Sequence, residues 1–173
     1  MKIKELMTPV SEYTTLKMDA TLSDVVTALA DSKHRDVFVV DENGKCQGIL
    51  TMTDIMLALE PNYKKIMGKD TASDILTNRL VGDLFAEYGL WGDTLAELCK
   101  KSLDINIQEA MYVPGENEFL NEEDDLEQGV HRYIAGMHQP LIVRSNGTVT
   151  GVLRLADLFE EIRNRMLTCT AEL

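Results

Sequence analysis

The run VFVVDENGKCQGILTMTD, residues 37–54, sets the architecture expected for this chain. It joins two apolar, β-rich runs through an Asn-Gly turn and ends at a polar helix start. The same succession returns about 103 positions later in residues 141–157, as LIVRSNGTVTGVLRLAD. Upstream, residues 3–7 (IKELM) return as residues 107–111 (IQEAM) at a spacing of about 104, so one residue has been lost between the copies. A doubled unit predicts two copies that face each other across a pseudo-twofold axis, with a cleft at their seam.

Composition narrows the class of protein. The chain has 173 residues, 45% of them hydrophobic and 27% charged, which is typical of a globular protein with a buried core. Its formal charge of −12 opposes binding to a phosphate backbone, so we expect no nucleic-acid partner. Cys46, Cys99 and Cys169 lie far apart without CxxC spacing, which favours a reducing compartment. The sequence has neither an apolar signal core nor a run of about 18 apolar residues, and we therefore expect a cytoplasmic protein without a membrane partner.

Local signals in the first copy predict the order strand, helix, strand, strand, helix. Thr21 and Asp24 form a capping box that opens the first helix, and Asn43-Gly44 is a strong hairpin signal because it readily adopts the positive φ angles of a tight turn. Pro61 ends the second helix. The expected elements are a strand at 13–16, a helix at 21–32, strands at 37–40 and 47–51, and a helix at 53–59.

The second copy keeps this order, and a helical insertion separates the two copies. Its expected elements are a strand at 118–121, a helix at 124–136, strands at 140–143 and 149–154, and a helix at 157–166. The insertion is too long for a plain loop and shows two amphipathic helices, at 74–88 and 93–101, around a Gly-rich break that holds Trp91. We divide the chain into repeat 1 (1–60), the insertion (61–104), repeat 2 (105–166) and a tail (167–173).

The joined pattern resembles a cystathionine β-synthase (CBS) domain, and the second copy resembles its partner in a tandem pair, the Bateman module. The segments that carry the resemblance are Met7-Thr8-Pro9, Asp19-Ala20-Thr21-Leu22, residues 37–44 and residues 48–54. The resemblance implies an α+β fold of two pseudo-twofold-related β-α-β-β-α repeats. It also implies that an adenosine-containing ligand such as AMP, ADP, ATP or S-adenosylmethionine binds between the repeats, that the role is sensory rather than enzymatic, and that the chain dimerises into a flat disc of four repeats.

The candidate ligand-binding residues lie at the seam. Thr51 could donate its hydroxyl to a phosphate at a helix N-terminus, where unpaired N–H groups and the helix dipole favour anions. Asp54 could accept both ribose hydroxyls with its two oxygens. His34 and Arg35 could add donors or charge on the phosphate side. By resemblance, the base is held at Thr14, Thr15, Val37 and Phe38.

The same residues have a purely structural interpretation. Thr51 with Asp54 is also a capping box, a pair that is common wherever a helix starts, and the two roles need not exclude each other. In the second copy, Arg154 stands where the first has Thr51, while Asp157 remains. Arg154 could clamp a phosphate bidentately, or it could fill the pocket and pair with Asp157. Equal occupancy of two sites is therefore not expected.

Other constellations point to no chemistry. The stretch 115–127 has seven acidic residues and no basic one, but it lacks the spacing of an EF-hand and reads as a solvated helix start. His131 and His138 complete no zinc set and are treated as surface or core residues. The chain shows no nucleophile elbow, Walker loop, dinucleotide fingerprint or zinc-protease motif. We expect no catalytic residue, no metal and no catalytic cofactor.

The sequence thus predicts a small regulatory module in which an adenosyl ligand favours one inter-repeat or inter-subunit geometry. The signal is expected to pass to an unidentified effector protein or through self-association as a homodimer. The insertion and a helical face with Leu155, Leu158, Phe159 and Ile162 are candidate docking surfaces, unless they only cover the sheets. Two alternatives remain open: a non-sensing dimerisation module, and a divalent-cation-responsive regulator that uses the acidic stretch.

Overall fold

The computed structural model describes residues 1–30, 32–60, 87–90, 92–136 and 138–171. Most of the helix expected at 74–88 lies outside these ranges, as does Trp91. The strands are β1 (Thr8–Pro9), β2 (Thr14–Lys17), β3 (Val37–Val40), β4 (Cys46–Leu50), β5 (Leu120–Asn121), β6 (Leu141–Ser145) and β7 (Thr148–Leu153). The helices are α1 (Leu22–Ala30), α2 (Met52–Leu59), α5 (Leu95–Ser102), α6 (Ile107–Ala110), α7 (Leu126–Ile134) and α8 (Leu155–Ala171), with 3₁₀ turns at Ile3–Glu5, Val10–Glu12 and Glu116–Glu118.

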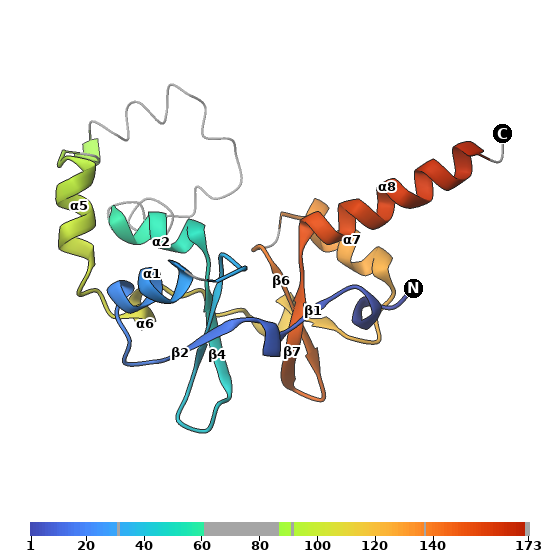
Figure 1. Cartoon of the computed structure of the whole chain (residues 1–173), viewed down its shortest axis with the longest axis horizontal. Helices are drawn as coiled ribbons and strands as arrows, with labels where there is room; N and C mark the ends of the chain where they lie inside the picture. Colours follow the sequence, from blue (N-terminus) through green and yellow to red (C-terminus); the bar gives the residue numbers. More distant parts are fainter. Residues whose placement is uncertain (31, 61–86, 91, 137, 172–173) are drawn as a thin grey trace.

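The described strands form two small sheets that stand side by side at the centre of the molecule (Figure 1). In the first sheet, β2 runs parallel to β3 and β3 antiparallel to β4. The second sheet repeats this arrangement with β5, β6 and β7, and β1 joins its edge beside β7. Helices α1, α2 and α6 pack on the first sheet, and α7 and α8 pack on the second. The predicted α+β fold of two equivalent halves is confirmed.

The two halves exchange their leading segments. Ile3, at the start of the chain, is fully buried in the core of the second half, and Ile107, 104 positions later, is fully buried in the core of the first. The backbone bridges follow the same offset, because Lys2 pairs with Asp125 and Asn106 pairs with Thr21. Each half therefore completes its hydrophobic core with a segment that precedes the other half in sequence.

Two equivalent glycines make room for the exchanged segments. A Cβ atom on Gly48 would lie 2.7 Å from the carbonyl oxygen of Tyr112, and one on Gly151 would lie 2.5 Å from that of Thr8. Both distances are too short for non-bonded atoms, and a backbone carbonyl cannot swing aside like the end of a side chain. Glycine at these two positions is thus required by the close approach of another backbone.

The hairpins show where the missing residue was lost. In the first half, Val40 pairs with Cys46 across residues 41–45, and only Gly44 has a positive φ, of 76°. In the second half the strands continue to the pair Ser145–Thr148, so Asn146-Gly147 alone make the turn with φ of 49° and 80°. These angles are those of a two-residue hairpin turn, whereas the first hairpin has the longer loop. The change of spacing from 104 to 103 therefore lies in the turn.

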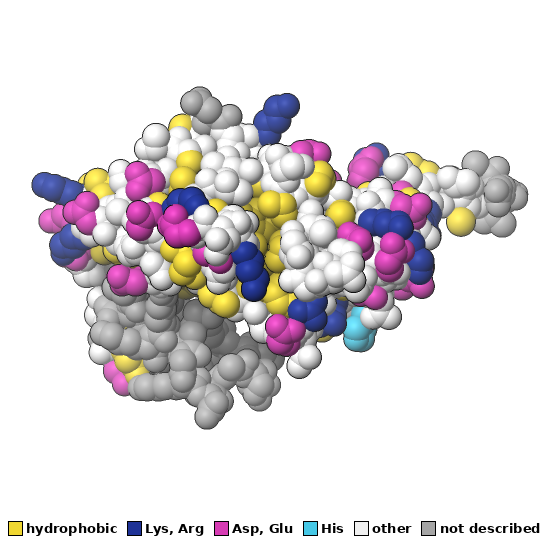
Figure 2. Space-filling model, turned by 90° about the horizontal axis from the view of Figure 1, so that it is seen from below, with side chains coloured by type: hydrophobic (Ala, Val, Ile, Leu, Met, Phe, Trp, Pro, Cys, Tyr) yellow, Lys and Arg dark blue, Asp and Glu magenta, His cyan; other side chains and the backbone are white. Residues whose placement is uncertain are grey.

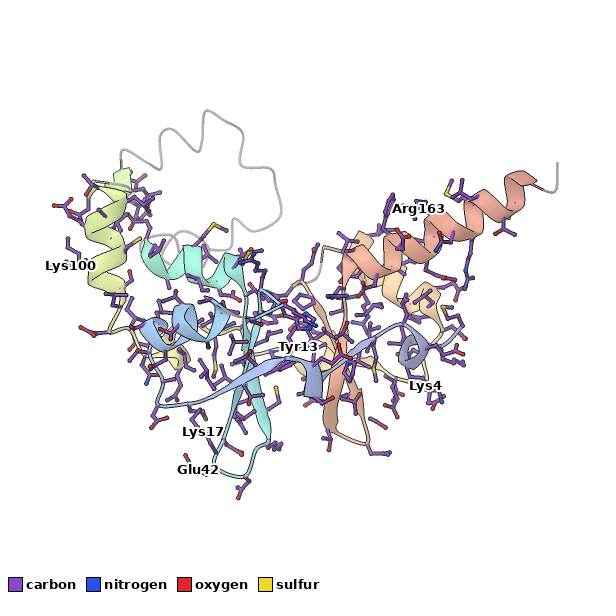
Figure 3. The ribbon with its side chains drawn as sticks, in the orientation of Figure 1. Lys4, Tyr13, Lys17, Glu42, Lys100 and Arg163 are labelled. Carbon is purple, nitrogen blue, oxygen red and sulfur yellow. The ribbon has the colours of Figure 1, made fainter. Side chains whose placement is uncertain are left out.

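A third apolar cluster joins the two sheets to each other. Its buried members come from both halves: Tyr13, Phe38, Ile49, Ile142 and Val152. Seen from below, hydrophobic side chains gather along the middle of the molecule, between charged groups on either side (Figure 2). Tyr13 lies in this central region, between the two sheets (Figure 3). The halves are therefore held together by a continuous core as well as by the exchanged segments.

Several element boundaries differ from the sequence prediction, including those of β5, α7 and α8. Glu118 belongs to a 3₁₀ turn rather than to a strand, because its carboxylate accepts hydrogen bonds from the Gly115 N–H and the Tyr112 hydroxyl. Helix α7 ends at Ile134, shortly before Gly136 with a φ of 75°. Helix α8 continues to Ala171, so most of the expected tail is helical. No glycine or proline interrupts α8, and an ion pair between Glu161 and Arg165 supports its later turns.

Candidate functional site

The N-terminal ends of α2 and α8 open onto one shared hollow at the seam. Its volume is about 260 Å³, and both halves line it. The first half contributes Asp36, Thr51 and Met52, and the second contributes Tyr133, Arg154 and Leu155. A hollow lined by two helix starts offers unpaired backbone N–H groups and the positive ends of two helix dipoles, an environment that favours an anion.

Asp54 is held at the start of α2 by the predicted capping box. Its Oδ2 atom accepts hydrogen bonds from the Thr51 N–H at 2.8 Å and from the Thr51 hydroxyl at 2.7 Å. The Thr51 Oγ1 in turn accepts from the Asp54 N–H. The residue is only 7% exposed, and its second oxygen, Oδ1, lies 3.4 Å from Nε2 of His138. Among the described residues, one oxygen is therefore anchored by Thr51, while the other has only His138 near it, beyond ordinary hydrogen-bond distance.

Two opposing effects act on the ionisation of Asp54. Burial by itself raises the pKa of this carboxyl, because the charged form loses solvation. The nearby His138 and the hydrogen bonds from Thr51 outweigh burial and hold the pKa of Asp54 below its ordinary value. The neighbouring Asp36 shows the other outcome, since burial and the charge of Asp54 raise the pKa of Asp36. Asp54 is thus a buried carboxylate at neutral pH, next to a carboxyl that is harder to ionise.

The equivalent position in the second half is organised differently. Arg154 occupies the place of Thr51 and forms a two-pronged ion pair with Asp157. Its Nε atom lies 2.6 Å from Oδ2 and its Nη2 atom lies 2.7 Å from Oδ1. A third nitrogen, Nη1, lies 3.4 Å from Nδ1 of His34. Both carboxylate oxygens of Asp157 are therefore engaged by one guanidinium group.

The two histidines cross over between the halves. His34 precedes β3 in the first half but contacts Arg154 of the second half, while His138 precedes β6 in the second half but contacts Asp54 of the first. Each ring also stacks on a tyrosine, His34 on Tyr13 at 4.1 Å between ring centres and His138 on Tyr112 at 3.7 Å. The structure therefore brings His34 to the Arg154–Asp157 pair, away from the Thr51–Asp54 pair of its own half.

The treatment of His138 as a surface or core residue is corrected by this geometry. Its Nε2 atom faces Asp54, and its Nδ1 atom is buried without a hydrogen-bond partner among the described residues. A signal for its position exists in the sequence, because His34 and His138 are separated by the repeat offset of 104. Asp36 and Tyr112 were also absent from the sequence-based candidates.

The remaining candidates lie deeper or farther out. Thr14 and Thr15 of β2 pair with Val37 and Phe38 of β3. Val37 points into the core of the first half and Phe38 into the cluster between the sheets, and both are fully buried. Arg35 is exposed. Thr51, Asp54, Arg154, Asp157 and His34 therefore lie along the seam, whereas Val37 belongs to the core of the first half and Phe38 to the cluster between the sheets.

Several acidic residues of the stretch 115–127 form ion pairs with basic residues from other parts of the chain. Lys2 pairs with Asp125 at 2.8 Å, Lys4 with Glu123 at 2.6 Å, and Arg144 with Glu116 at 2.7 Å. The bases come from the exchanged N-terminal segment and from β6, which the sequence order does not bring near. Among the described residues, no group of three or more His, Cys, Asp or Glu side chains is placed to hold a metal ion. The described helices also include none that is long and apolar enough to cross a membrane.

Comparison with known proteins identifies the fold. Residues 3–61 match the family model of the CBS domain. No curated protein matches the sequence. Among solved structures, CBSX2 in complex with AMP is 13% identical over 95% of this chain and 98% of its own, with a TM-score of 0.61. The CBS domain of a bacterial CNNM/CorC-family Mg²⁺ transporter in complex with ATP is 18% identical over 94% and 87%, with a TM-score of 0.60. A putative acetoin utilization protein (AcuB) from Vibrio cholerae is 17% identical over 100% and 97%, with a TM-score of 0.59.

Proposed function

Because the chain folds as a CBS domain pair and its residues 3–61 match the CBS domain model, we propose that it is a regulatory module that binds an adenosine-containing ligand between its repeats. The ligand is an adenine nucleotide (AMP, ADP or ATP) or S-adenosylmethionine. The module acts by binding and not by catalysis. Two of its structural relatives, at 13% and 18% identity, were solved with AMP and with ATP.

The observation that carries this proposal is the burial of Asp54 together with the hydrogen bonding of its two oxygens. A buried carboxylate lies at a helix start beside a hollow of about 260 Å³. Its Oδ2 is fixed by Thr51, and within the described part of the chain its Oδ1 is approached only by His138. Such an oxygen can accept a hydrogen bond from a ribose hydroxyl, and the adjoining α2 N-terminus can receive a phosphate. The buried, unpartnered Nδ1 of His138 adds a second polar atom near the same place.

Binding at this seam would couple the repeats. Asp54 and Thr51 belong to one repeat, and His138 and Arg154, which also contact this region, belong to the other. A ligand that prefers one relative position of the repeats shifts the population of that position by the difference in its affinity for the two states. A ligand that bound both states equally would transmit nothing.

An exposed apolar patch supports transmission through a homodimer. Met52 and Met56 on α2 are 53% and 56% exposed, and Leu155 and Phe159 on α8 are 47% and 63% exposed. The two pairs are related by the repeat offset of 103 and flank the same seam. A patch with internal twofold symmetry suits an isologous dimer, in which the same surface is used by both subunits. Leu158 and Ile162, the other members of the expected docking face, instead pack on the second sheet.

The dimer has its own test. We expect sedimentation analysis to show a dimer for the wild type and a monomer for the double variant Met56→Glu, Phe159→Glu. Ile134→Glu is the matched control, because Ile134 on α7 is 81% exposed but lies outside the patch. A monomeric wild type, or a double variant that remains dimeric, would contradict the assignment of this surface.

Calorimetric titration with AMP, ADP, ATP, adenosine and S-adenosylmethionine tests the ligand. We expect Asp54→Asn to weaken binding about 10- to 150-fold, since a hydrogen bond to a charged group contributes about 1.5–3 kcal/mol. Asp24→Asn is the matched control, because Asp24 makes the same capping box with Thr21 at the exposed start of α1. Binding that is unchanged in Asp54→Asn would refute the role of this carboxylate.

A thermal-shift series separates this proposal from its two alternatives. A ligand at 100 times its dissociation constant adds about 2.7 kcal/mol of stability, which for a chain of this length raises the melting temperature by about 5–11 °C. A rise with nucleotide supports the proposal. A rise with Mg²⁺ or Ca²⁺ alone would indicate a cation-responsive regulator, and no rise with any of these would indicate an assembly module.

A further inference from the structure

The two halves place unlike side chains at the same structural position. The carbonyl oxygen of Thr51 accepts from the Ile55 N–H at the start of α2, and that of Arg154 accepts from the Leu158 N–H at the start of α8. Asp54 and Asp157 each follow three residues later. The backbone therefore builds two equivalent helix starts, and the difference between them lies in the side chains Thr51 and Arg154.

This difference changes what each aspartate can bind. Thr51 engages only one oxygen of Asp54, whereas Arg154 engages both oxygens of Asp157, at 2.6 and 2.7 Å. The paired N–H groups of a guanidinium match the two oxygens of a carboxylate, so this contact leaves Asp157 no oxygen directed at another donor pair. A ribose has to donate to these same oxygens.

Arg154 also lies between two hollows. It lines the shared hollow of about 260 Å³ and a second one of about 290 Å³ formed by Leu6, Thr8, Asp157, Glu160 and Glu161. The second hollow has Asp157 in its lining. Its carboxylates at Glu160 and Glu161 already pair with Arg163 and Arg165 further along α8. Arg154 is therefore the basic residue that pairs with Asp157 in this hollow.

His34 approaches the guanidinium from the other repeat. Its Nδ1 atom lies 3.4 Å from Nη1 of Arg154, and its ring is stacked on Tyr13, which is 6% exposed. Arg154 is thus held at Asp157 by the ion pair within its own half, with a longer contact to His34 across the seam. Because the group is tethered to the same helix as Asp157, it competes with a free ligand as if present at a concentration on the order of millimolar or higher.

We infer that Arg154 closes the second ligand site, so that each chain binds one adenosyl ligand, at Asp54. The inference rests on the proposed function and adds to it the number of occupied sites and the residue that sets this number. Arg154 acts as a built-in occupant that takes the place of the ribose at Asp157. Replacing it with threonine, the residue at the equivalent position of the first repeat, opens the second site.

Calorimetry and equilibrium dialysis with AMP as the probe measure the number of ligands per chain. We expect one high-affinity site for the wild type, none for Asp54→Asn, whose remaining site is about 10- to 150-fold weaker, two for Arg154→Thr, and one for the double variant Asp54→Asn, Arg154→Thr. Arg163→Thr is the control, because Arg163 also pairs with a carboxylate three residues away on α8 but lines neither hollow. It should bind one AMP.

The outcomes distinguish this inference from the proposed function. Two AMP molecules on the wild type, one AMP bound by Asp54→Asn with wild-type affinity, or a single AMP on Arg154→Thr would each overturn the inference while nucleotide binding stands. The first two results do not depend on any change at Arg154, so they decide the question even where Arg154→Thr fails to fold. If neither the wild type nor Arg154→Thr bound AMP, ADP, ATP or S-adenosylmethionine, the proposed function would be overturned, and the inference with it.

Discussion

Replacing Gly151 with alanine tests the exchange of segments between the repeats. The new Cβ atom would lie 2.5 Å from the carbonyl oxygen of Thr8 and 3.2 Å from Sδ of Met7. Thr8 pairs with Val152 in the edge of the second sheet, so its carbonyl cannot move unless β1 moves with it. The protein then has two responses: β1 stays and the sheet edge is strained, or the whole N-terminal segment leaves.

The free-energy costs of the two responses decide which one the protein adopts. Overpacking a well-packed site costs about 1–3 kcal/mol. Release of the segment exposes Ile3, which is fully buried, at about 1.5–3 kcal/mol, and breaks the hydrogen bonds from the Ile3 and Lys4 N–H groups at about 0.5–1.5 kcal/mol each. Release is the costlier response, so the segment stays in place under strain. We expect Gly151→Ala to lose about 2 kcal/mol, or about 4–8 °C in melting temperature.

A double-mutant cycle in urea unfolding provides the check. Ile3→Ala alone should cost about 2–5 kcal/mol and weaken the attachment of the segment, so that alanine at 151 now releases it. The double variant should therefore lose less than the sum of the two single losses, by about 0.5–3 kcal/mol. Gly92→Ala is the control, because its Cβ would meet nothing closer than 3.4 Å, and should leave the stability unchanged or slightly raised. Full additivity, or a Gly151→Ala protein as stable as the wild type, would refute the reasoning.

Three further predictions concern single side chains. The folded state holds the pKa of Asp54 below its unfolded value, so the stability that Asp54 contributes is present above about pH 4 and is lost as the pH falls through the folded pKa. In urea titrations from pH 6 to pH 3, the free energy of unfolding of Asp54→Asn should therefore change less with pH than that of the wild type. The hydroxyl of Tyr133 donates to the Leu153 carbonyl at 2.6 Å, and Tyr133→Phe should lower the free energy of unfolding by about 0.5–1.5 kcal/mol. Phe38 is fully buried between the sheets, and Phe38→Ala should cost about 3–5 kcal/mol in the same assay, unlike an exposed substitution such as Ile134→Ala.

Elements with local signals could be predicted from the sequence. The capping boxes at Thr21 and Thr51 and the Asn-Gly hairpins form from residues a few positions apart, so their chemistry is visible in a short window. The doubling of the pattern gave the two equivalent halves. The expected helix at 93–101 is confirmed as α5. The α+β architecture followed because these local elements recur in the same order.

The exchange of segments left no local signal. Residues 3–7 form only one 3₁₀ turn, and nothing in their spacing says which sheet they join. The need for glycine at positions 48 and 151 becomes visible only in the structure, where each glycine lies against a backbone carbonyl of the exchanged segment. Long-range pairing of this kind depends on the closure of the whole chain, and a periodicity argument does not reach it.

The sequence predicted the site only in part, because some of its contacts are local and others depend on how the two halves face each other. Thr51 with Asp54 and Arg154 with Asp157 are local pairs, and the structure contains both. The crossing of His34 and His138 is a property of how the halves face each other, so sequence proximity assigns His34 to its own repeat. The offset of 104 between the two histidines shows that they are equivalent, but only the facing geometry shows that His138 contacts Asp54 and His34 contacts Arg154, each in the opposite half.

The exposed apolar patch keeps the twofold relation of the repeats, whereas the seam does not, and this difference bears on how a ligand could act. The exposed pairs Met52–Met56 and Leu155–Phe159 keep the twofold relation, whereas Thr51 and Arg154 break it. Exchanged segments and a shared core resist large movement of one repeat against the other, so the weaker contacts are the ones a ligand can alter. The His138–Asp54 contact, at 3.4 Å, is such a contact, and it lies at the start of the helix that carries Met52 and Met56. A ligand that replaced His138 at Asp54 would act first on α2, on one side of the twofold-related patch. In the proposed dimer it would thereby change the contact between the subunits without opening either core.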